Sequence, residues 1–168
     1  MSRHHPQGEM TPYVTRFGVG WIRHRGTEVV ELRLPAPAQG PTWSASSPSD
    51  IVSLAHLLSD YFAGRGPLPP AGDLVARAGT TPFLMSIYEV VAGIPPGATM
   101  TYRMVAEATG RPGAARVVGA AMATNPFAPV IPCHRVVGSD GTLRGYGGGL
   151  EMKQALLDME RGVLTLGM

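Results

Sequence analysis

The 168-residue sequence contains one cysteine, one lysine and no long apolar run. A single cysteine cannot form a disulfide within the chain, which predicts a reducing environment, and it excludes a zinc site built from several cysteines. No segment approaches the roughly 18 to 20 apolar residues that a membrane-spanning helix needs. Residues 1–10 contain no apolar segment of the secretory-signal type. The sequence therefore predicts a cytoplasmic protein without a membrane partner.

The net charge is also small, at +2, so the chain has no strong global field. Lys153 is the only lysine beside many arginines, which we interpret as a compositional bias. The charge is unevenly placed, because the stretch from 100 to 150 carries an excess of arginine, namely Arg103, Arg111, Arg116, Arg135 and Arg144 against Glu107 and Asp140. Such a stretch can contact phosphates, but it is weak evidence alone.

The first part of the chain predicts a flexible tail followed by a small α/β domain over 13–79. Residues 1–12 are polar and typical of a loose terminus. Apolar and charged residues alternate within 13–34, which predicts strands of a small antiparallel sheet. Within these strands, Trp21 and His24 are expected to be packing and surface residues.

One helix completes this domain. A loop rich in proline and serine, over 35–48, leads to a helix that Ser49 or Asp50 can cap. Its apolar residues fall on one stripe, as expected when a helix packs on a sheet. Residues 64–79 contain several prolines and glycines and predict a linker, so we place the domain boundary there.

Residues 80–168 predict a mainly α-helical domain. Thr81 followed by Pro82 is typical of a helix start. Helices predicted over 102–109 and 114–123, with a glycine-containing turn between them, form a helix-turn-helix of winged-helix-like type. The second helix of such a pair can enter a groove of DNA.

That second helix has almost no bulky side chains. Ala114, Ala115 and Gly119 are among its small residues, and Arg116 is its one long cation. One interpretation is tight packing against a neighbouring helix. The other is close approach to DNA, because small faces suit the minor groove.

Cys133 lies in the segment Pro132-Cys133-His134-Arg135. A neighbouring histidine or arginine favours the reactive thiolate, whereas a lone cysteine is more commonly an inert core residue. The residues alone leave both interpretations open. They disfavour a thiol hydrolase, in which cysteine and histidine are distant in sequence, because no other histidine follows in this half of the chain.

With its flanking motifs, this segment resembles the O6-alkylguanine-DNA alkyltransferases, or methylated-DNA–protein-cysteine methyltransferases. The resemblance is strong from about 82 to 162 and weak over the N-terminal third. Its motifs occur in the family's order and spacing: Thr101-Tyr102, the segment 114–122, Asn125-Pro126, Pro-Cys-His-Arg-Val at 132–136, Gly-Tyr-Gly-Gly-Gly at 145–149, and Glu160 in a helix predicted over 151–161.

The resemblance implies repair of DNA by direct reversal. The protein is expected to bind duplex DNA containing O6-alkylguanine or O4-alkylthymine, to flip the base out of the stack and to transfer the alkyl group irreversibly to Cys133. No cofactor or metal is expected. The expected state is a monomer that can assemble cooperatively on DNA.

The resemblance also implies a role for individual residues in the chemistry. The family relay runs from Cys133 to His134, through a water, and on to Glu160, which would orient the imidazole. Asn125 would tie the recognition helix to the active-site loop. The implied base pocket comprises Tyr102, Met122, Val136 through its carbonyl, Tyr146, Gly147 and Gly148.

The implied DNA contacts come mainly from the recognition helix. Arg116 would fill the hole left by the flipped base. The others are Thr101, Ala114, Ala115, Gly119 and Arg135. Gly147 departs from relatives that carry serine there, which keeps a backbone N–H but loses a hydroxyl.

Two alternatives stay open. A non-catalytic DNA-binding or lesion-sensing module could use the same helix-turn-helix. Cys133 argues against the known alkyltransferase-like proteins of that kind, because they lack the cysteine. A thiol hydrolase is the other alternative, and it would show turnover on esters.

Overall fold

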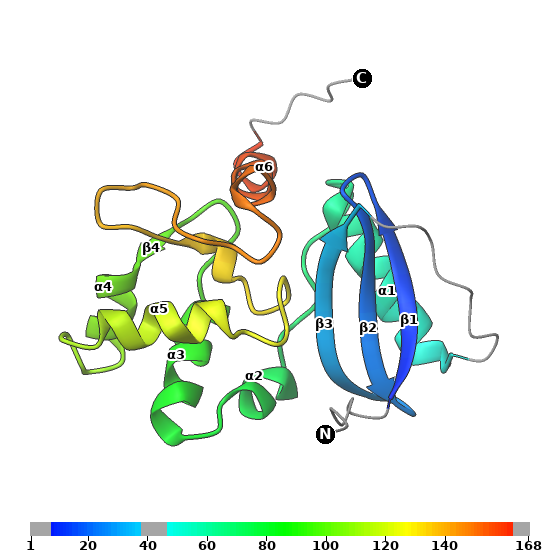
Figure 1. The fold of residues 1–168 in the computed structure, drawn as a ribbon, viewed down its shortest axis with the longest axis horizontal. Helices are drawn as coiled ribbons and strands as arrows, with labels where there is room; N and C mark the ends of the chain where they lie inside the picture. The colour runs from blue at the N-terminus through cyan, green and yellow to red at the C-terminus, as the bar shows by residue number, and fades with distance from the viewer. Residues whose placement is uncertain (1–7, 38–46, 163–168) are drawn as a thin grey trace, which may run out of the picture.

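The computed structural model describes residues 8–37 and 47–162. Most of the predicted tail and of the predicted loop over 35–48 lies outside the described residues. Figure 1 shows two parts side by side, a sheet backed by one helix and a larger group of helices. This arrangement agrees with the predicted order of an α/β part followed by a mainly helical part.

Three antiparallel strands form the N-terminal sheet in the order β1-β2-β3. They are β1 (Glu9–Thr15), β2 (Gly18–Arg25) and β3 (Glu28–Ala36). The prediction of a tail up to residue 12 was wrong, because β1 pairs with β2 from Glu9 onward. Thr11 and Tyr13 are buried in this pairing, so packing rather than local polarity decides the conformation.

His24 on β2 also differs from its prediction as a surface residue. Its side chain is fully buried. One ring nitrogen lies 2.9 Å from Thr11 Oγ1 and the other 2.8 Å from the Gly26 carbonyl oxygen. These two partners satisfy the polar atoms of the ring, and burial is then tolerated.

Helix α1 (Ser49–Phe62) covers one face of the sheet (Figure 1). The Tyr13 ring of β1 stacks on Phe62 with 6.0 Å between ring centroids. The predicted cap was wrong, because Pro48 occupies the N-cap position and no side chain makes a capping hydrogen bond there.

The helical part is built from α2 (Asp73–Ala78), α3 (Pro82–Ala92), α4 (Tyr102–Ala108), α5 (Ala115–Ala123) and α6 (Leu150–Glu160). The predicted linker over 64–79 thus contains a short helix, α2, which buries Val75 and Ala78. Thr81 caps α3 by accepting a hydrogen bond from Leu84 N at 3.2 Å, as predicted.

Helices α4 and α5 form the predicted helix-turn-helix. Thr101 caps α4 by accepting a hydrogen bond from Met104 N at 3.1 Å. Gly110, in the turn, has φ 75°, a conformation that favours glycine. A two-stranded parallel sheet joins β4 (Met100–Thr101) to β5 (Val136–Val137), so the start of α4 is fixed to the segment that follows Cys133.

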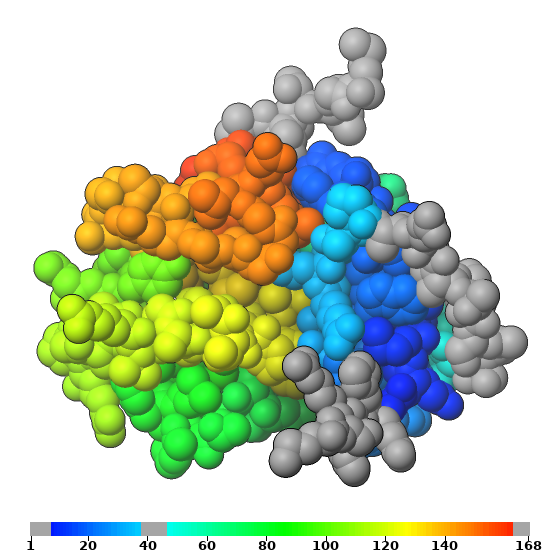
Figure 2. All heavy atoms as spheres, in the orientation of Figure 1, coloured from blue at the N-terminus to red at the C-terminus, as the bar shows by residue number. Residues whose placement is uncertain are grey.

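The two parts of the molecule are in direct contact. Leu32 N on β3 donates a hydrogen bond to the Pro126 carbonyl at 2.8 Å. On the face shown in Figure 2, atoms of β3 (light blue) lie against yellow and orange atoms of the helical part. Among the helices of the described residues, none is long and apolar enough to cross a membrane.

Candidate active site

Cys133 begins a single 3-10 turn, η1 (Cys133–Arg135), at the end of an apolar segment. The cysteine is only 5% exposed and forms no disulfide. Burial raises the pKa of the Cys133 thiol, although hydrogen bonding from Asn125 and the charge of Lys153 act in the opposite direction. The resting thiol is therefore protonated at neutral pH, and it needs a base to react as a thiolate.

Asn125 holds the segment that leads to the cysteine. Its side-chain Nδ2 donates to the Ile131 carbonyl at 2.8 Å, and its Oδ1 accepts from Phe127 N at 3.0 Å. The residue follows directly after α5 and its C-cap Thr124. Asn125 thus connects the second helix of the helix-turn-helix with the loop that carries Cys133, in the place that the resemblance implies.

His134 is fully buried beside Cys133. Its Nε2 lies 3.0 Å from Glu160 Oε1 and 3.1 Å from the Tyr61 hydroxyl. Its Nδ1 has no hydrogen-bond partner among the residues that the structure describes. Burial lowers the pKa of His134, although Glu160 acts against that effect, so the ring is neutral at physiological pH. A neutral ring that donates from Nε2 leaves Nδ1 as a proton acceptor.

Glu160 ends α6 and is the acidic partner of this histidine. Its side chain is only 3% exposed. Burial alone would raise the pKa of Glu160, but hydrogen bonds from His134, Arg135 and Tyr61 outweigh it and hold the pKa well below its usual range. The group is therefore a carboxylate, and it can stabilise a positive imidazolium.

Arg135 is buried and does not lie on the surface, where a DNA contact would require it. The residue is 4% exposed, and its guanidinium bonds to both carboxylate oxygens of Glu160, with the shortest contact at 2.7 Å. It also donates to the Ile94 carbonyl at 2.5 Å. The predicted DNA contact of Arg135 is therefore corrected to a buried ion pair. The sequence did not indicate this ion pair, because the partner of Arg135 lies 25 positions away in α6.

Sequence reasoning missed two polar residues of this centre. The hydroxyl of Tyr61 donates to Glu160 Oε1 at 2.7 Å, yet the apolar stripe of its helix indicated only a core residue. Lys153 is 1% exposed, and its Nζ donates to the Val136 carbonyl at 2.7 Å and the Arg144 carbonyl at 3.2 Å. That Lys153 is the only lysine was the one available signal.

Lys153 changes the electrostatics of the site. Its charge lowers the pKa of Cys133, while burial lowers the pKa of Lys153 itself. It also binds the Val136 carbonyl, which the resemblance assigned to the flipped base. A carbonyl oxygen has two lone pairs, and Lys153 occupies one of them.

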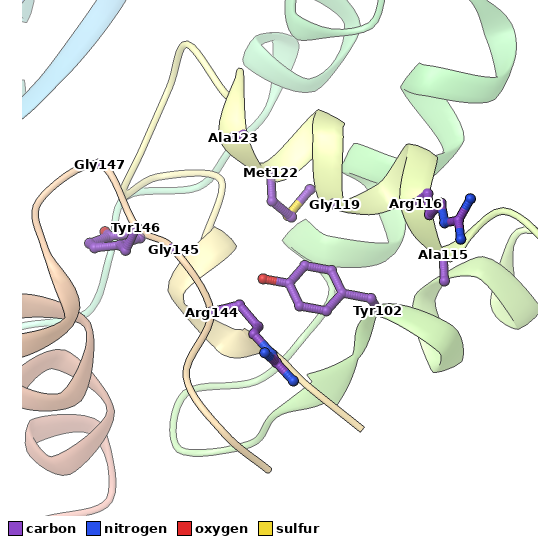
Figure 3. A pocket seen from close by; sticks show the side chains of 10 residues that line it. All are labelled: Tyr102, Ala115, Arg116, Gly119, Met122, Ala123, Arg144, Gly145, Tyr146 and Gly147. Atoms are coloured by element: carbon purple, nitrogen blue, oxygen red, sulfur yellow. The ribbon is translucent and has the colours of Figure 1, made fainter. Parts of the chain in front are cut away.

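A cleft of about 640 Å³ lies between α5 and the loop before α6 (Figure 3). The cleft is lined by Tyr102, Ala115, Arg116, Gly119, Met122, Ala123, Arg144, Gly145, Tyr146 and Gly147. This lining includes most of the predicted pocket residues, together with Arg144, which was not predicted. The structure thus brings the helix-turn-helix and the glycine-rich loop to one site. In the described parts of the chain, no three His, Cys, Asp or Glu side chains could together hold a metal ion.

Tyr102 and Tyr146 stand at this cleft from opposite elements. Figure 3 shows the Tyr102 ring between Met122 of α5 and Arg144 of the loop. Burial raises the pKa of Tyr102, so its phenol stays a hydrogen-bond donor. The Tyr146 ring meets His134 edge to face, with 6.3 Å between centroids. Tyr146 therefore connects the cleft with the buried centre.

Most of the small residues of α5 are at least partly exposed. A Cβ added at Gly119 would meet no atom within 4 Å, so glycine is not required there for packing within the protein. Arg116 and Ala123 are exposed, whereas Val118 and Ala121 are buried. This arrangement favours close approach of a large ligand over tight packing against a neighbouring helix.

The remaining predicted residues lie outside the cleft lining. Thr101 and Ala114 occupy the N-cap positions of α4 and α5. Val136 is fully buried in β5, and a Cβ added at Gly148 would collide with the side chain of Met152.

Comparison with known protein families points to one family. Residues 82–162 match the model described as 6-O-methylguanine DNA methyltransferase, DNA binding domain. A methylated-DNA–protein-cysteine methyltransferase of Salmonella typhimurium is 45% identical over 117 residues, which is 70% of this chain and 66% of that protein. One of Mycolicibacterium paratuberculosis is 42% identical over 148 residues, which is 86% of this chain and 87% of that protein.

Solved structures resemble the whole molecule. The crystal structure of the Mycobacterium tuberculosis O6-methylguanine methyltransferase has a TM-score of 0.72 and 30% identity, covering 95% of this chain and 96% of that one. Its complex with DNA gives a TM-score of 0.70 at 30% identity, covering 92% of this chain and 94% of that one. The similarity therefore includes the N-terminal sheet, where the sequence resemblance is weak.

Proposed function

The chain belongs to the methylated-DNA–protein-cysteine methyltransferase family, and from that membership we propose that it repairs DNA by direct reversal. It binds alkylated duplex DNA and moves the alkyl group from O6 of guanine, or O4 of thymine, onto Cys133 in one irreversible turnover. The observation that carries this proposal is the buried Cys133 beside a neutral, carboxylate-paired imidazole, next to a cleft on a helix-turn-helix.

The proposed chemistry is a nucleophilic displacement at the alkyl carbon. The thiol proton passes through a water to His134 Nδ1, and Sγ forms a bond to the alkyl carbon while the bond from carbon to O6 breaks. The resulting imidazolium is stabilised by Glu160 at 3.0 Å. The guanine leaves with the electron pair of the broken bond, and the Tyr102 phenol donates a hydrogen bond to it. The product thioether is stable, so the protein acts once.

The proposed binding mode places α5 in the minor groove with the target base in the cleft. An alkyl group inside the base stack is out of reach, so the nucleotide must rotate out, and a damaged pair is less costly to open. The outward-facing Gly119 and Ala123 allow close approach of the duplex, and Arg116 fills the hole left by the base.

Intact mass spectrometry tests this function directly. After incubation with duplex DNA containing O6-methylguanine, we expect the protein mass to increase by one methyl group, because the thioether persists. Peptide mapping should place the methyl group on Cys133, and unmethylated duplex should leave the mass unchanged. If no methyl group is gained, the proposed function is wrong.

Replacing Arg116 with alanine tests whether this side chain fills the gap that the flipped base leaves in the duplex. Unstacking a base costs a few kcal/mol, so the loss of a side chain that fills the gap should slow repair of duplex DNA on the order of tenfold. Reaction with the free base O6-benzylguanine requires no flipping and should be nearly unaffected. Single-turnover rates on both substrates measure the difference.

Arg103→Ala is the matched control for lost charge. Arg103 lies on α4, is exposed and pairs with Glu107 at 3.1 Å, outside the cleft lining. At saturating DNA, this variant should repair duplex DNA at the rate of the unaltered protein. Equal slowing of both substrates by Arg116→Ala would contradict the proposed role.

A further inference from the structure

One side chain from the N-terminal α/β part reaches the buried centre of the helical part. Tyr61, near the end of α1, is 2% exposed, and its hydroxyl lies 2.7 Å from Glu160 Oε1 and 3.1 Å from His134 Nε2. The matched family model begins only at residue 82, so it does not contain this tyrosine. The hydroxyl therefore joins a centre whose other hydrogen-bonded side chains, His134, Arg135 and Glu160, come from the helical part.

The protons in this group of three follow from the donors available. Burial first, and then the charge of Glu160, raise the pKa of Tyr61 far above its ordinary value, so the phenol keeps its single proton. The carboxylate can only accept, so that proton points to Glu160. The phenol oxygen can then offer only a lone pair to His134 Nε2.

Both neighbours of Nε2 are consequently acceptors. A hydrogen atom on Nε2 satisfies them, whereas an unprotonated Nε2 would face two oxygens with no hydrogen between them. In a neutral imidazole, a proton on Nε2 leaves the lone pair on Nδ1. Nδ1 is the ring nitrogen without a partner in the described part of the chain.

We propose that Tyr61 is a positioning residue for alkyl transfer: its hydroxyl, bonded to Glu160 and His134 together, holds the imidazole in the Nε2–H tautomer and leaves Nδ1 to take the thiol proton. This inference rests on the proposed function for its effect on rate. It assigns the N-terminal part a share in the chemistry.

The position of the hydroxyl is fixed by packing in the N-terminal part. The Tyr61 ring lies edge to face with Phe62 at 5.5 Å, and Phe62 stacks on Tyr13 of β1. A second contact, from Leu32 N to the Pro126 carbonyl, fixes the same part of the molecule beside Asn125. The sheet and α1 thus hold the active-site segment at two separate points.

Tyr61→Phe removes the hydroxyl and keeps the ring. We expect single-turnover transfer to slow on the order of tenfold on both O6-methylguanine duplex and free O6-benzylguanine, because the lost group bonds to a charged acceptor. DNA affinity should stay unchanged. In a long-range proton–nitrogen NMR spectrum, the unaltered protein should show His134 protonated at Nε2, and the variant should show a shifted Nε2 resonance.

Tyr13→Phe is the matched control. Tyr13 is also a buried tyrosine of the N-terminal part, but its hydroxyl donates to the Arg33 carbonyl at 2.7 Å instead of to Glu160. The Tyr13→Phe protein should be less stable than the unaltered protein, but its transfer rate and the NMR resonances of His134 should not change.

Three results would overturn the inference: an Nδ1–H tautomer in the unaltered protein, an unchanged Nε2 resonance in Tyr61→Phe, or an unchanged transfer rate in a folded Tyr61→Phe. The first measurement needs no variant. If the unaltered protein transferred no alkyl group, the proposed function would fail, whereas the tautomer experiment would still report on the hydrogen bonds of Tyr61.

Discussion

Cys133→Ser is expected to abolish alkyl transfer while DNA binding remains. A hydroxyl is a far weaker nucleophile than a thiolate, and the neutral His134 cannot compensate for that difference. The cleft is unaffected by the change, because its lining is formed by α5, Tyr102 and the glycine-rich loop and does not include Cys133. Intact mass should show no added methyl group, and a mobility-shift assay should show binding equal to that of the unaltered protein.

The same variant separates the proposed function from its alternatives. In cells without other alkyltransferases, Cys133→Ser should give no protection against a methylating agent. Full protection would instead support a lesion-sensing module that needs no thiol, and turnover on ester substrates by the unaltered protein would support a thiol hydrolase. Because the side chain is buried, Cys133→Ala, which adds no polar group, serves as a check on folding.

The helical part was predicted well because its boundaries are set locally. Thr81 and Thr101 each provide a hydroxyl that accepts a hydrogen bond from a backbone N–H three residues later. A threonine at this position is a local sequence signal for the start of a helix. Helix α2 and the start of β1 were missed for the opposite reason. Their segments are rich in proline, glycine or polar residues, and burial of Val75 and of Tyr13 against distant parts of the chain decides their conformation.

The chemistry of the centre could be predicted only in part. Cys133, His134 and Glu160 were located through the family motif. The partners that bury and orient them were not, because Tyr61 and Glu160 are 99 positions apart and Arg135 and Glu160 are 25 apart. No local sequence pattern indicates that the cation beside Cys133 forms a buried ion pair with a distant carboxylate.

Helix α5 is a case in which the structure decides between two interpretations that the sequence leaves open. A run of alanine and glycine is equally consistent with close helix packing and with close ligand approach. The open space around Gly119 favours the second interpretation, because no neighbouring atom would meet a side chain there.

Glu160→Gln is expected to affect both stability and reaction. Arg135 would remain buried without its counter-charge, and removing one partner of a buried ion pair costs about 3–5 kcal/mol, or a fall in Tm of roughly 10 °C for a chain of this size. His134 would lose the carboxylate that stabilises the imidazolium, so transfer should slow on the order of a hundredfold or more. Thermal unfolding and single-turnover rates measure the two effects.

Asp60→Asn is the matched control, because it removes the carboxylate of an exposed ion pair instead of a buried one. Asp60 pairs with Arg65 at 2.6 Å, but both side chains are about half exposed or more, so the change should cost about 1 kcal/mol or less and leave transfer intact.

The pKa of Glu160 is held below its unfolded value of about 4.3, so its carboxylate stabilises the fold above that pH and loses this effect as the pH falls further. The stability difference between the unaltered protein and Glu160→Gln should therefore be full at neutral pH and shrink below about pH 4. A difference that stays constant down to acid pH would show that Glu160 is not the buried carboxylate on which the centre depends.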